Sequence, residues 1–416
     1  MLRHERDTEV SQEGGGGVSR PTSATEEAEL RHLATRLADA GANLTVELPG
    51  AGAIEIGADP TRARVIFRSA DAVAALLRGD HLALAEAYLH CRIDLTGEVR
   101  QALFVTDQLD LGSRSRLKEA LVWLRFVIDR RRFARHSISH HYDRSPAFFL
   151  AWLDRSRSYT HGFYASPDDD LTVAQTRKLQ FAIDSLGLRA GMEVLDIGCG
   201  WGAFLEYAGV RGIRVHGITL SREQHAVVSE LIRTRNLPCS VECVDFFDYQ
   251  PAGPFDAAVF MGSLEHIPDY RFVGRFLTRH LRPDAAVYAD FVTTGEGRLA
   301  GAFLRKYIFP GVTGYVDLGA LVGALAPSGF HVRELTEDTL SCAYTVRDWA
   351  RSLESGHADL AARFGELPVR AFLLYLWSSH HFLATNQTQA YHLVAARTPR
   401  EQPAGVAIRV ERSERG

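Results

Sequence analysis

The sequence contains no apolar run of the length that a membrane span requires, which is about 18 residues. It also has no excess of positive charge, since 47 Lys and Arg stand against 51 Asp and Glu for a formal net charge of −4. A dedicated nucleic-acid-binding protein would be basic, so we expect no nucleic-acid partner. The first residues are charged and no apolar segment follows them, so we expect no signal peptide.

Cysteine is scarce as well, with five scattered residues in a chain of 416. An odd and dispersed set argues against a disulfide scaffold and favours a cytoplasmic protein. Cys239 and Cys243 are spaced like half of a zinc site but lack a second ligand pair. We therefore expect two ordinary thiols there and no bound metal.

Composition divides the chain into five segments. Residues 1–26 are polar and glycine-rich and residues 399–416 mix Pro, Gly and charge, so both predict flexible tails. Residues 27–112 combine short strand patterns with helical ones, which predicts a small α+β domain. Residues 141–398 form the large domain, and residues 113–140 link the two.

The linking segment is strongly basic. Eight Lys and Arg stand against two acids within residues 113–136, where apolar residues recur at helical spacing. This pattern predicts a basic amphipathic helix, which can lie on an anionic membrane surface. A solvated helix that bridges two domains is the alternative, and both interpretations stay open.

Strand and helix patterns alternate from about residue 172 to residue 395. The expected strands share short apolar runs bounded by turn signals, and they cover residues 193–196, 214–218, 240–244, 257–261, 286–291 and 391–395. This order predicts an α/β fold with a doubly wound, mostly parallel sheet and helices on both of its faces.

The most informative motif is VLDIGCGWG at residues 194–202, where an apolar strand leads through glycines into a helix. Gly198 and Gly200 let the backbone approach a ligand closely. The spacing is tighter than in dinucleotide-binding loops, and Asp196 precedes the glycines. A carboxylate at this point suits a cofactor with an amine and a cationic centre, which is S-adenosylmethionine. A tight turn without a ligand is the alternative.

The second strand of this region ends without an acidic residue, which argues further against a nicotinamide cofactor. Thr219 and Gln224 are the groups available to hydrogen-bond a ribose. Ser221 stands at the start of the next helix and is expected to be its N-cap.

Two further strand ends carry polar side chains. Asp245 can accept a hydrogen bond from an adenine amine and Phe246 can contact the ring face, although Phe246 can also be an ordinary core residue. Glu265 and His266 follow the fourth strand, at the sheet edge where open α/β sheets hold their substrates.

Several motifs occur in the order of one known family: HYD at 141–143, SYTHGFY at 158–164, LSREQ at 220–224, LEH at 264–266 and KYIFPG at 306–311. Through them, residues from about 40 to 395 resemble the cyclopropane-fatty-acid synthases, which include the mycolic acid cyclopropane synthases. The resemblance implies a class I methyltransferase Rossmann-like sheet. Residues 79–88 resemble the N-terminal lipid-binding-like α+β domain of the two-domain members.

The resemblance also implies a chemistry. Family members move a methyl group from S-adenosylmethionine onto a carbon–carbon double bond of a lipid acyl chain, and a base then takes a proton from the added methyl. By motif position, the residues implied to hold the cofactor are Tyr159, Thr160, Gly198, Gly200, Thr219, Gln224 and Phe246. Aromatic faces are candidates to stabilise the intermediate cation, with plain packing as the alternative: Tyr142, Phe163, Tyr307 and Tyr315.

The chain departs from the family at the site where members hold bicarbonate as the base. His161 stands at the position of a Cys, Asp290 at that of a His and Cys342 at that of a Tyr, whereas Glu265 matches. A further departure is Leu383, where members commonly carry Arg. Two carboxylates disfavour another anion, so we doubt that bicarbonate binds.

We therefore expect a protein group to take the proton, with Glu265, His161 and Asp290 as candidates, unless the reaction ends differently. A structural ion pair between His161 and Asp290 is the alternative for those two residues.

Three functions stay open. The first is a C-methyltransferase that acts on an unsaturated fatty acyl lipid or similar hydrophobic alkene. The second is a methyltransferase of a small specialised metabolite, and the third is a cofactor-binding protein that has lost methyl transfer. The expected partner is a lipid or hydrophobic small molecule; peripheral contact with a membrane and a homodimer also stay open.

Overall fold

The computed structural model describes residues 22–50, 52–108, 145–267, 269–294, 301–309 and 314–397. The chain forms two compact units, Met1–Asp110 and Leu111–Gly416. The predicted basic helix over 113–140, the motif at 141–143 and the tail at 399–416 lie outside the described residues. The domain boundaries inferred from composition stay predictions.

The first unit contains a four-stranded sheet in the order β2-β1-β3-β4, in which β1 and β3 are parallel and the other pairs antiparallel. Side chains from the sheet and its helices form a core of their own. The elements are α1 (Ala24–Asp39), β1 (Leu44–Leu48), β2 (Gly52–Ile56), β3 (Ala63–Phe67), α2 (Ala70–Leu77), α3 (His81–Leu89), β4 (Ile93–Gly97) and α4 (Val99–Gln108).

The prediction of a flexible tail up to residue 26 is wrong at its end, because α1 already begins at Ala24. The Ser23 hydroxyl accepts a hydrogen bond from the Glu26 amide at 3.2 Å, and the Glu26 carboxylate accepts one from the Ser23 amide at 2.8 Å. This reciprocal capping box satisfies two amides that a helix start otherwise leaves without partners.

The second unit is built on a seven-stranded sheet in the order β10-β11-β9-β8-β5-β6-β7. The neighbours from β9 to β7 pair in parallel, and β11 is antiparallel to both of its neighbours. The strands are β5 (Glu193–Ile197), β6 (Arg214–Thr219), β7 (Ser240–Cys243), β8 (Phe255–Met261), β9 (Leu281–Thr293), β10 (Phe330–Glu337) and β11 (Gln389–Arg397). The expected mostly parallel sheet and its six expected strands are confirmed.

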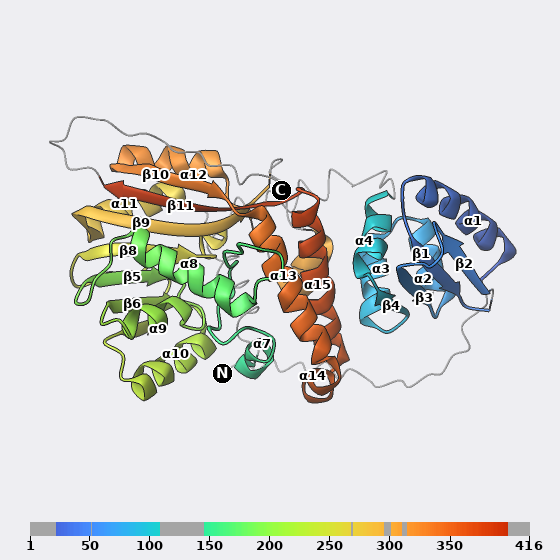
Figure 1. Ribbon diagram of the computed structural model, residues 1–416, viewed down its shortest axis with the longest axis horizontal. Coiled ribbons are helices and arrows are strands. Elements are labelled where there is room, and N and C mark those ends of the chain that lie inside the picture. Colours follow the sequence, from blue (N-terminus) through green and yellow to red (C-terminus); the bar gives the residue numbers. More distant parts are fainter. Residues whose placement is uncertain are drawn as a thin grey trace, which may run out of the picture. The chain divides into compact units, whose positions relative to one another are not determined.

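Helices cover both faces of this sheet (Figure 1). Consecutive strand residues point to opposite faces, so Val194 joins the core beneath α8, α9 and α10, whereas Leu195 joins the core beneath α11 and α12. The helices are α8 (Leu171–Ser185), α9 (Ala203–Gly209), α10 (Arg222–Arg235), α11 (Tyr270–His280) and α12 (Leu318–Leu325). Both faces are buried, which explains the continuous apolar runs of the central strands.

Between β10 and β11 the sequence forms three further helices, α13 (Thr339–Ser355), α14 (His357–Phe364) and α15 (Glu366–Ala384). Helix α13 packs along α15 (Figure 1). Aromatic rings join these helices to α7 (Pro146–Leu150) and to the segment that precedes α8. The ring centroids of Tyr159 and Trp349 lie 5.1 Å apart, and those of Phe149 and Phe372 lie 5.5 Å apart. This packing anchors the segment that carries Tyr159.

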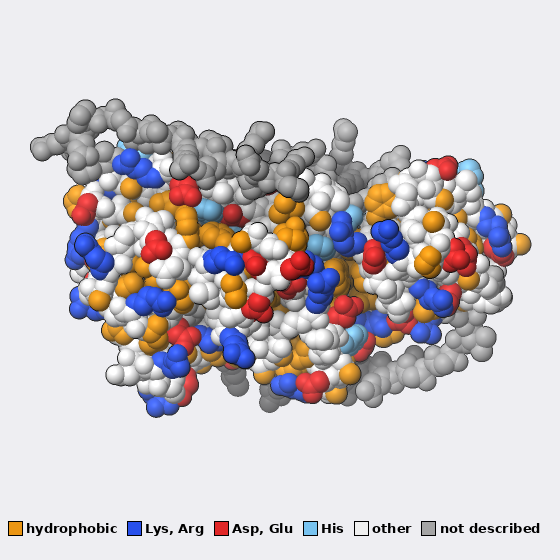
Figure 2. Space-filling model, viewed as in Figure 1, with side chains coloured by type: hydrophobic (Ala, Val, Ile, Leu, Met, Phe, Trp, Pro, Cys, Tyr) orange, Lys and Arg blue, Asp and Glu red, His pale blue; other side chains and the backbone are white. Residues whose placement is uncertain are grey.

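Figure 2 shows basic and acidic side chains interspersed over the visible face, in keeping with the small net charge. Among the described residues, no helix combines the length and the hydropathy that a membrane span needs.

Candidate active site

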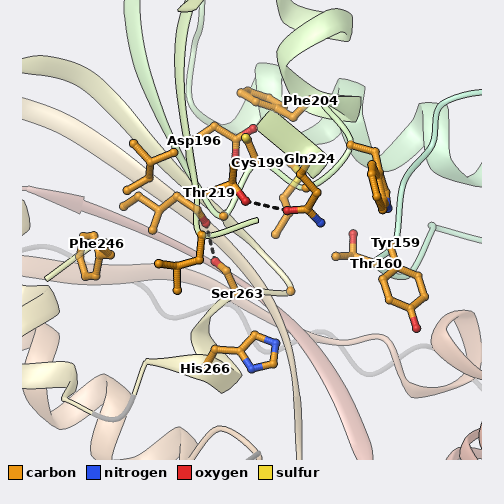
Figure 3. A pocket seen from close by; sticks show the side chains of 18 of the residues that line it. Tyr159, Thr160, Asp196, Cys199, Phe204, Thr219, Gln224, Phe246, Ser263 and His266 are labelled. Carbon is orange, nitrogen blue, oxygen red and sulfur yellow. Dashed lines mark hydrogen bonds between the residues drawn. The ribbon is translucent and has the colours of Figure 1, made fainter. Parts of the chain in front are cut away.

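A pocket opens at the carboxyl ends of β5, β6, β7 and β8 (Figure 3). It is the place where open α/β sheets bind their ligands. The nine residues that the sequence predicted for the cofactor all line it: Tyr159, Thr160, Asp196, Gly198, Gly200, Thr219, Gln224, Asp245 and Phe246. The structure thus brings them together, while their contact with a cofactor stays a prediction.

The glycine loop between β5 and α9 depends on backbone conformations that favour glycine. Gly198 and Gly200 have φ angles of 80° and 53°. A Cβ on Gly198 would also lie 2.7 Å from the Cβ of Ser263, which is closer than side chains tolerate. By contrast, no described heavy atom lies within 4 Å of a Cβ placed on Gly200, so the loop leaves room beside it.

Asp196 is the next-to-last residue of β5 and is nearly buried, being 2% exposed. Burial raises the pKa of this carboxyl to about 7, the negative charge of Asp290 adds to the effect, and Lys178 opposes it. A cation in the pocket would favour the ionised form of Asp196.

Thr219, the last residue of β6, and Gln224 in α10 form a hydrogen-bonded pair in the pocket wall. The Thr219 hydroxyl donates to the Gln224 amide oxygen at 2.7 Å (Figure 3). The Gln224 backbone amide donates to the Ser221 hydroxyl at 3.2 Å, so Ser221 is confirmed as the N-cap of α10. The pair is therefore held in one orientation against the pocket.

Asp245 and Phe246 follow β7. The Asp245 carboxylate accepts from the Phe247 amide at 2.8 Å, which fixes its direction. Phe246 lines the pocket, yet it is only 7% exposed and its ring centroid lies 4.7 Å from that of Phe276. The core role and the pocket role that the sequence left as alternatives therefore coexist.

Glu265 lies in the short 3-10 turn η1 (Leu264–His266) after β8. Its Oε1 accepts from the Val292 amide at 2.8 Å, whereas its buried Oε2 has no hydrogen-bond partner among the described residues. Burial raises the pKa of Glu265 to about 7, and the charge of Asp290 contributes in the same direction. The neighbouring His266 lines the pocket, and burial lowers its pKa to about 4.

Asp290 lies in β9 and is fully buried. The Tyr288 hydroxyl donates to its Oδ2 at 3.3 Å, and within the described part of the chain its Oδ1 has no partner. Glu265 and Asp290 thus each leave one buried carboxylate oxygen available. Neither is among the described residues that line the pocket of Figure 3, so a shared site with the cofactor stays a prediction.

The alternative pairing of His161 with Asp290 is wrong. His161 Nε2 lies 3.1 Å from Asp338 Oδ2, and His392 Nδ1 lies 2.5 Å from the same oxygen. Asp338 immediately precedes α13 and faces His161, while Asp290 faces Tyr288. The role of His161 as a base stays untested.

The remaining expected residues are more dispersed. Tyr307 lies in the π-helical turn η2 (Leu304–Ile308), with its ring centroid 5.7 Å from that of Phe303, and its role stays a prediction. Cys342 is buried in α13, and burial raises its pKa well above the usual value. Leu383 is buried in α15, and Tyr142 lies outside the described residues.

Sequence reasoning missed several pocket-lining residues and the groups behind them. Trp201, Phe204 and Ser263 line the pocket; Trp201 belongs to the glycine motif itself, and Phe204 lies in α9, the helix that follows it. Gln175 and Lys178 lie on the buried face of α8, behind the pocket wall. Two polar residues on an otherwise apolar helix face were the available signal. The described residues contain no group of three or more His, Cys, Asp or Glu placed to hold a metal.

Comparisons with known proteins show which family the chain resembles. A family model described as mycolic acid cyclopropane synthetase matches residues 129–393. A probable fatty acid methyltransferase of Pseudomonas putida is 30% identical over 304 residues, which are 70% of this chain and 76% of that protein. A probable fatty acid methyltransferase of Mycobacterium tuberculosis is 31% identical over 270 residues, which are 63% of this chain and 62% of that protein.

Among solved structures, mycolic acid cyclopropane synthase CmaA1 complexed with SAH and CTAB matches with a TM-score of 0.59 and 24% identity. The match covers 63% of this chain and 98% of that one. This likeness shows the fold, and the expected class I methyltransferase sheet is confirmed.

Proposed function

The chain belongs to the mycolic acid cyclopropane synthetase family, and from this premise we propose that it transfers a methyl group from S-adenosylmethionine to a carbon–carbon double bond. It is a methyltransferase of the cyclopropane-synthase type. The proposed acceptor is an unsaturated fatty acyl lipid or a similar hydrophobic alkene. The observation that carries the proposal is the convergence of nine residues, chosen from the sequence, on one pocket.

The chemistry of the pocket residues fits S-adenosylmethionine. The Asp196 carboxyl suits the cationic end of the cofactor, and the Gln224 amide, held by Thr219, suits the ribose. Asp245 suits the adenine amine and Phe246 its ring face. The open space beside Gly200 allows a ligand to approach the backbone. When bound, the cofactor supplies an electrophilic methyl group.

The residues of the chain have two tasks in this reaction. An alkene is a weak nucleophile, so the pocket must hold its π electrons in line with the methyl carbon and the sulfur and must exclude water. As the new carbon–carbon bond forms, the carbon–sulfur bond breaks and a positive charge develops on the former alkene. A base must then take a proton from the added methyl so that the cyclopropane ring closes.

We assign the base to Glu265. Its Oε1 is fixed by the Val292 amide, which leaves the buried Oε2 as the proton acceptor. A pKa of about 7 suits a base that works near neutral pH. Asp290 disfavours a bicarbonate ion nearby because like charges repel. Peripheral membrane contact through 113–140 and a homodimer stay predictions.

The first experiment tests methyl transfer. Purified protein is incubated with S-adenosylmethionine and vesicles of monounsaturated phospholipid, and the release of S-adenosylhomocysteine and the lipid masses are measured. We expect a gain of one CH2 unit per acyl chain. Gly198→Ala should abolish this gain, because its Cβ would meet Ser263 at a positive φ angle. Gly253→Ala is the matched control, since its added Cβ would meet no described atom within 4 Å.

The second experiment tests the base. Glu265→Gln should lower turnover roughly 100-fold or more, whereas the exposed Glu230→Gln should leave it unchanged. Turnover of the unchanged protein should be the same in carbonate-free buffer and with added bicarbonate. Full turnover by Glu265→Gln, or an absolute need for bicarbonate, would overturn this assignment and leave methyl transfer itself standing.

A further inference from the structure

Lysine is rare in this chain, with three residues among 47 Lys and Arg. Lys178 is buried within the fold. It is 0% exposed and lies on α8, three residues after the equally buried Gln175. An ammonium group taken out of water is costly unless it is paired and hydrogen-bonded. The contacts of Lys178 therefore indicate what it does.

Two of these contacts reach the wall of the pocket. Lys178 Nζ donates to the Ser158 hydroxyl at 2.9 Å and also to the Thr160 hydroxyl. Both Ser158 and Thr160 line the pocket. Gln175 adds a tie from the same helix, because its side-chain amide donates to the Thr160 carbonyl at 2.6 Å. Helix α8 thus holds the segment from Ser158 to Thr160 through two buried polar side chains.

The same segment is tightly packed on its other side. A Cβ on Gly262, which directly follows β8 and has a φ of 64°, would lie 2.4 Å from the Thr160 methyl carbon. Thr160 is therefore confined between Gly262 and Lys178. A shift of the lysine would move a residue that lines the pocket.

Lys178 also faces buried acidic groups from several elements. Its Nζ lies 4.0 Å from Asp290 Oδ2 on β9. It interacts electrostatically with Asp196 on β5, Asp154 after α7 and the Cys342 thiol on α13. Burial lowers the pKa of the Lys178 ammonium, whereas these acidic groups favour its charged form. In its charged form Lys178 in turn favours the ionised form of Asp196.

We propose that Lys178 is a positioning residue of the cofactor site, which holds Ser158 and Thr160 in place. The inference rests on the proposed cofactor. It assigns Lys178 no contact with substrate or cofactor, since its action passes through the groups it binds. A compact ammonium with three donors meets two hydroxyls and a carboxylate here, a set that the planar fork of arginine does not match.

Calorimetric binding of S-adenosylmethionine and S-adenosylhomocysteine to the full chain tests the proposal. Lys178→Met should weaken S-adenosylmethionine binding at least tenfold at pH 7, and it should move the pH midpoint of that binding upward because Asp196 loses a favourable charge. Arg233→Met, which removes an exposed positive charge on α10, should change neither.

A double-mutant comparison separates positioning from general damage. Lys178→Met and Thr160→Val should lose less together than the product of their separate losses, because both remove the same hydrogen bond. If Lys178→Met does not fold, Ser158→Ala and Thr160→Val carry the test, and each should weaken binding several-fold.

The outcomes are distinct. The inference is overturned if the Lys178→Met variant binds S-adenosylmethionine with an affinity within twofold of that of the unchanged protein and with the same pH midpoint. Full-strength binding by both Ser158→Ala and Thr160→Val does the same. Failure of the unchanged protein to bind either compound overturns the proposed function instead.

Discussion

At the scale of a single residue, the ionisation of Asp196 controls how the pocket interacts with a cation. Its carboxyl is nearly buried, lines the pocket and has a pKa raised to about 7 by burial and by the charge of Asp290. Lys178 limits this rise. The carboxyl is thus poised so that a cation entering the pocket favours its ionised form, and the binding of a cation must in turn depend on pH.

The first prediction is a pH dependence that distinguishes the charged cofactor from its neutral product. As the pH falls through about 7, an increasing fraction of Asp196 is protonated, so the affinity for S-adenosylmethionine should fall with decreasing pH, by roughly tenfold per pH unit at most. S-adenosylhomocysteine lacks the sulfonium charge and should show a weaker dependence. Calorimetry between pH 5.5 and pH 8.5, about 1.5 pH units on either side of the raised pKa, measures both.

Asp196→Asn is the control for this prediction, because the amide keeps the shape of the side chain and cannot ionise. The difference between the two ligands should disappear in this variant. An equal pH dependence of both ligands in the unchanged protein would contradict the role assigned to Asp196.

Several pocket residues were predictable from sequence because they lie at or just after the carboxyl end of a strand, and the carboxyl ends of parallel strands meet at one edge of the sheet. Asp196, Thr219 and Asp245 are examples. Lys178 was not predictable in this way. The role of its ammonium group becomes visible only from its hydrogen bonds to Ser158 and Thr160, and these contacts depend on tertiary packing.

At the scale of elements, Asp338 joins three parts of the fold. It accepts hydrogen bonds from His161, which precedes α8, and from His392 on β11, and it immediately precedes α13. Burial alone would raise the pKa of Asp338, but the two histidines outweigh it and lower the pKa below its usual value. Burial lowers the pKa of His392, but its hydrogen bond to Asp338 outweighs this effect and raises the pKa overall.

The second prediction concerns the stability that this junction provides. Asp338→Asn should lower the free energy of unfolding by about 1–3 kcal/mol. The stability that the ionised Asp338 contributes is fully present above pH 3.8, its usual pKa. It is lost as the pH falls through the lowered pKa that Asp338 has in the folded protein. The stability that the protonated His392 contributes is fully present below pH 6.5, its usual pKa. It is lost as the pH rises through the raised pKa that His392 has in the folded protein. The cost should therefore be largest between these two pH values.

Urea denaturation of both proteins at several pH values measures this difference. Asp359→Asn, whose side chain is 72% exposed on α14, serves as the control and should cost little. A cost for Asp338→Asn that stays constant from pH 4 to pH 8 would contradict the assignment.

The sequence predicted some helices and strands better than others. The central strands β5 and β8 are buried on both faces, so their apolar runs stand out. Strand β10 was missed because it is an edge strand in which only Phe330 is buried. The contact of His161 with Asp338 spans 177 residues of sequence, which no local pattern reveals.

At the scale of the whole molecule, the two units have separate cores, and the described residues that line the pocket all belong to the second. Family membership accounts for the fold and the cofactor pocket. Three of the four residue types that the resemblance implies for a bicarbonate site are replaced in this chain, so the fate of the proton is the step of the proposed reaction to test.

The fate of the methyl hydrogens tests the central claim most directly. The protein is given S-adenosylmethionine with a trideuterated methyl group and vesicles of monounsaturated phospholipid, without bicarbonate, and the acyl chains are analysed by mass spectrometry. The account predicts acyl chains that have gained one CD2 unit, since one deuteron is lost to Glu265. Acyl chains without deuterium, or label found on an oxygen or nitrogen atom, would contradict it.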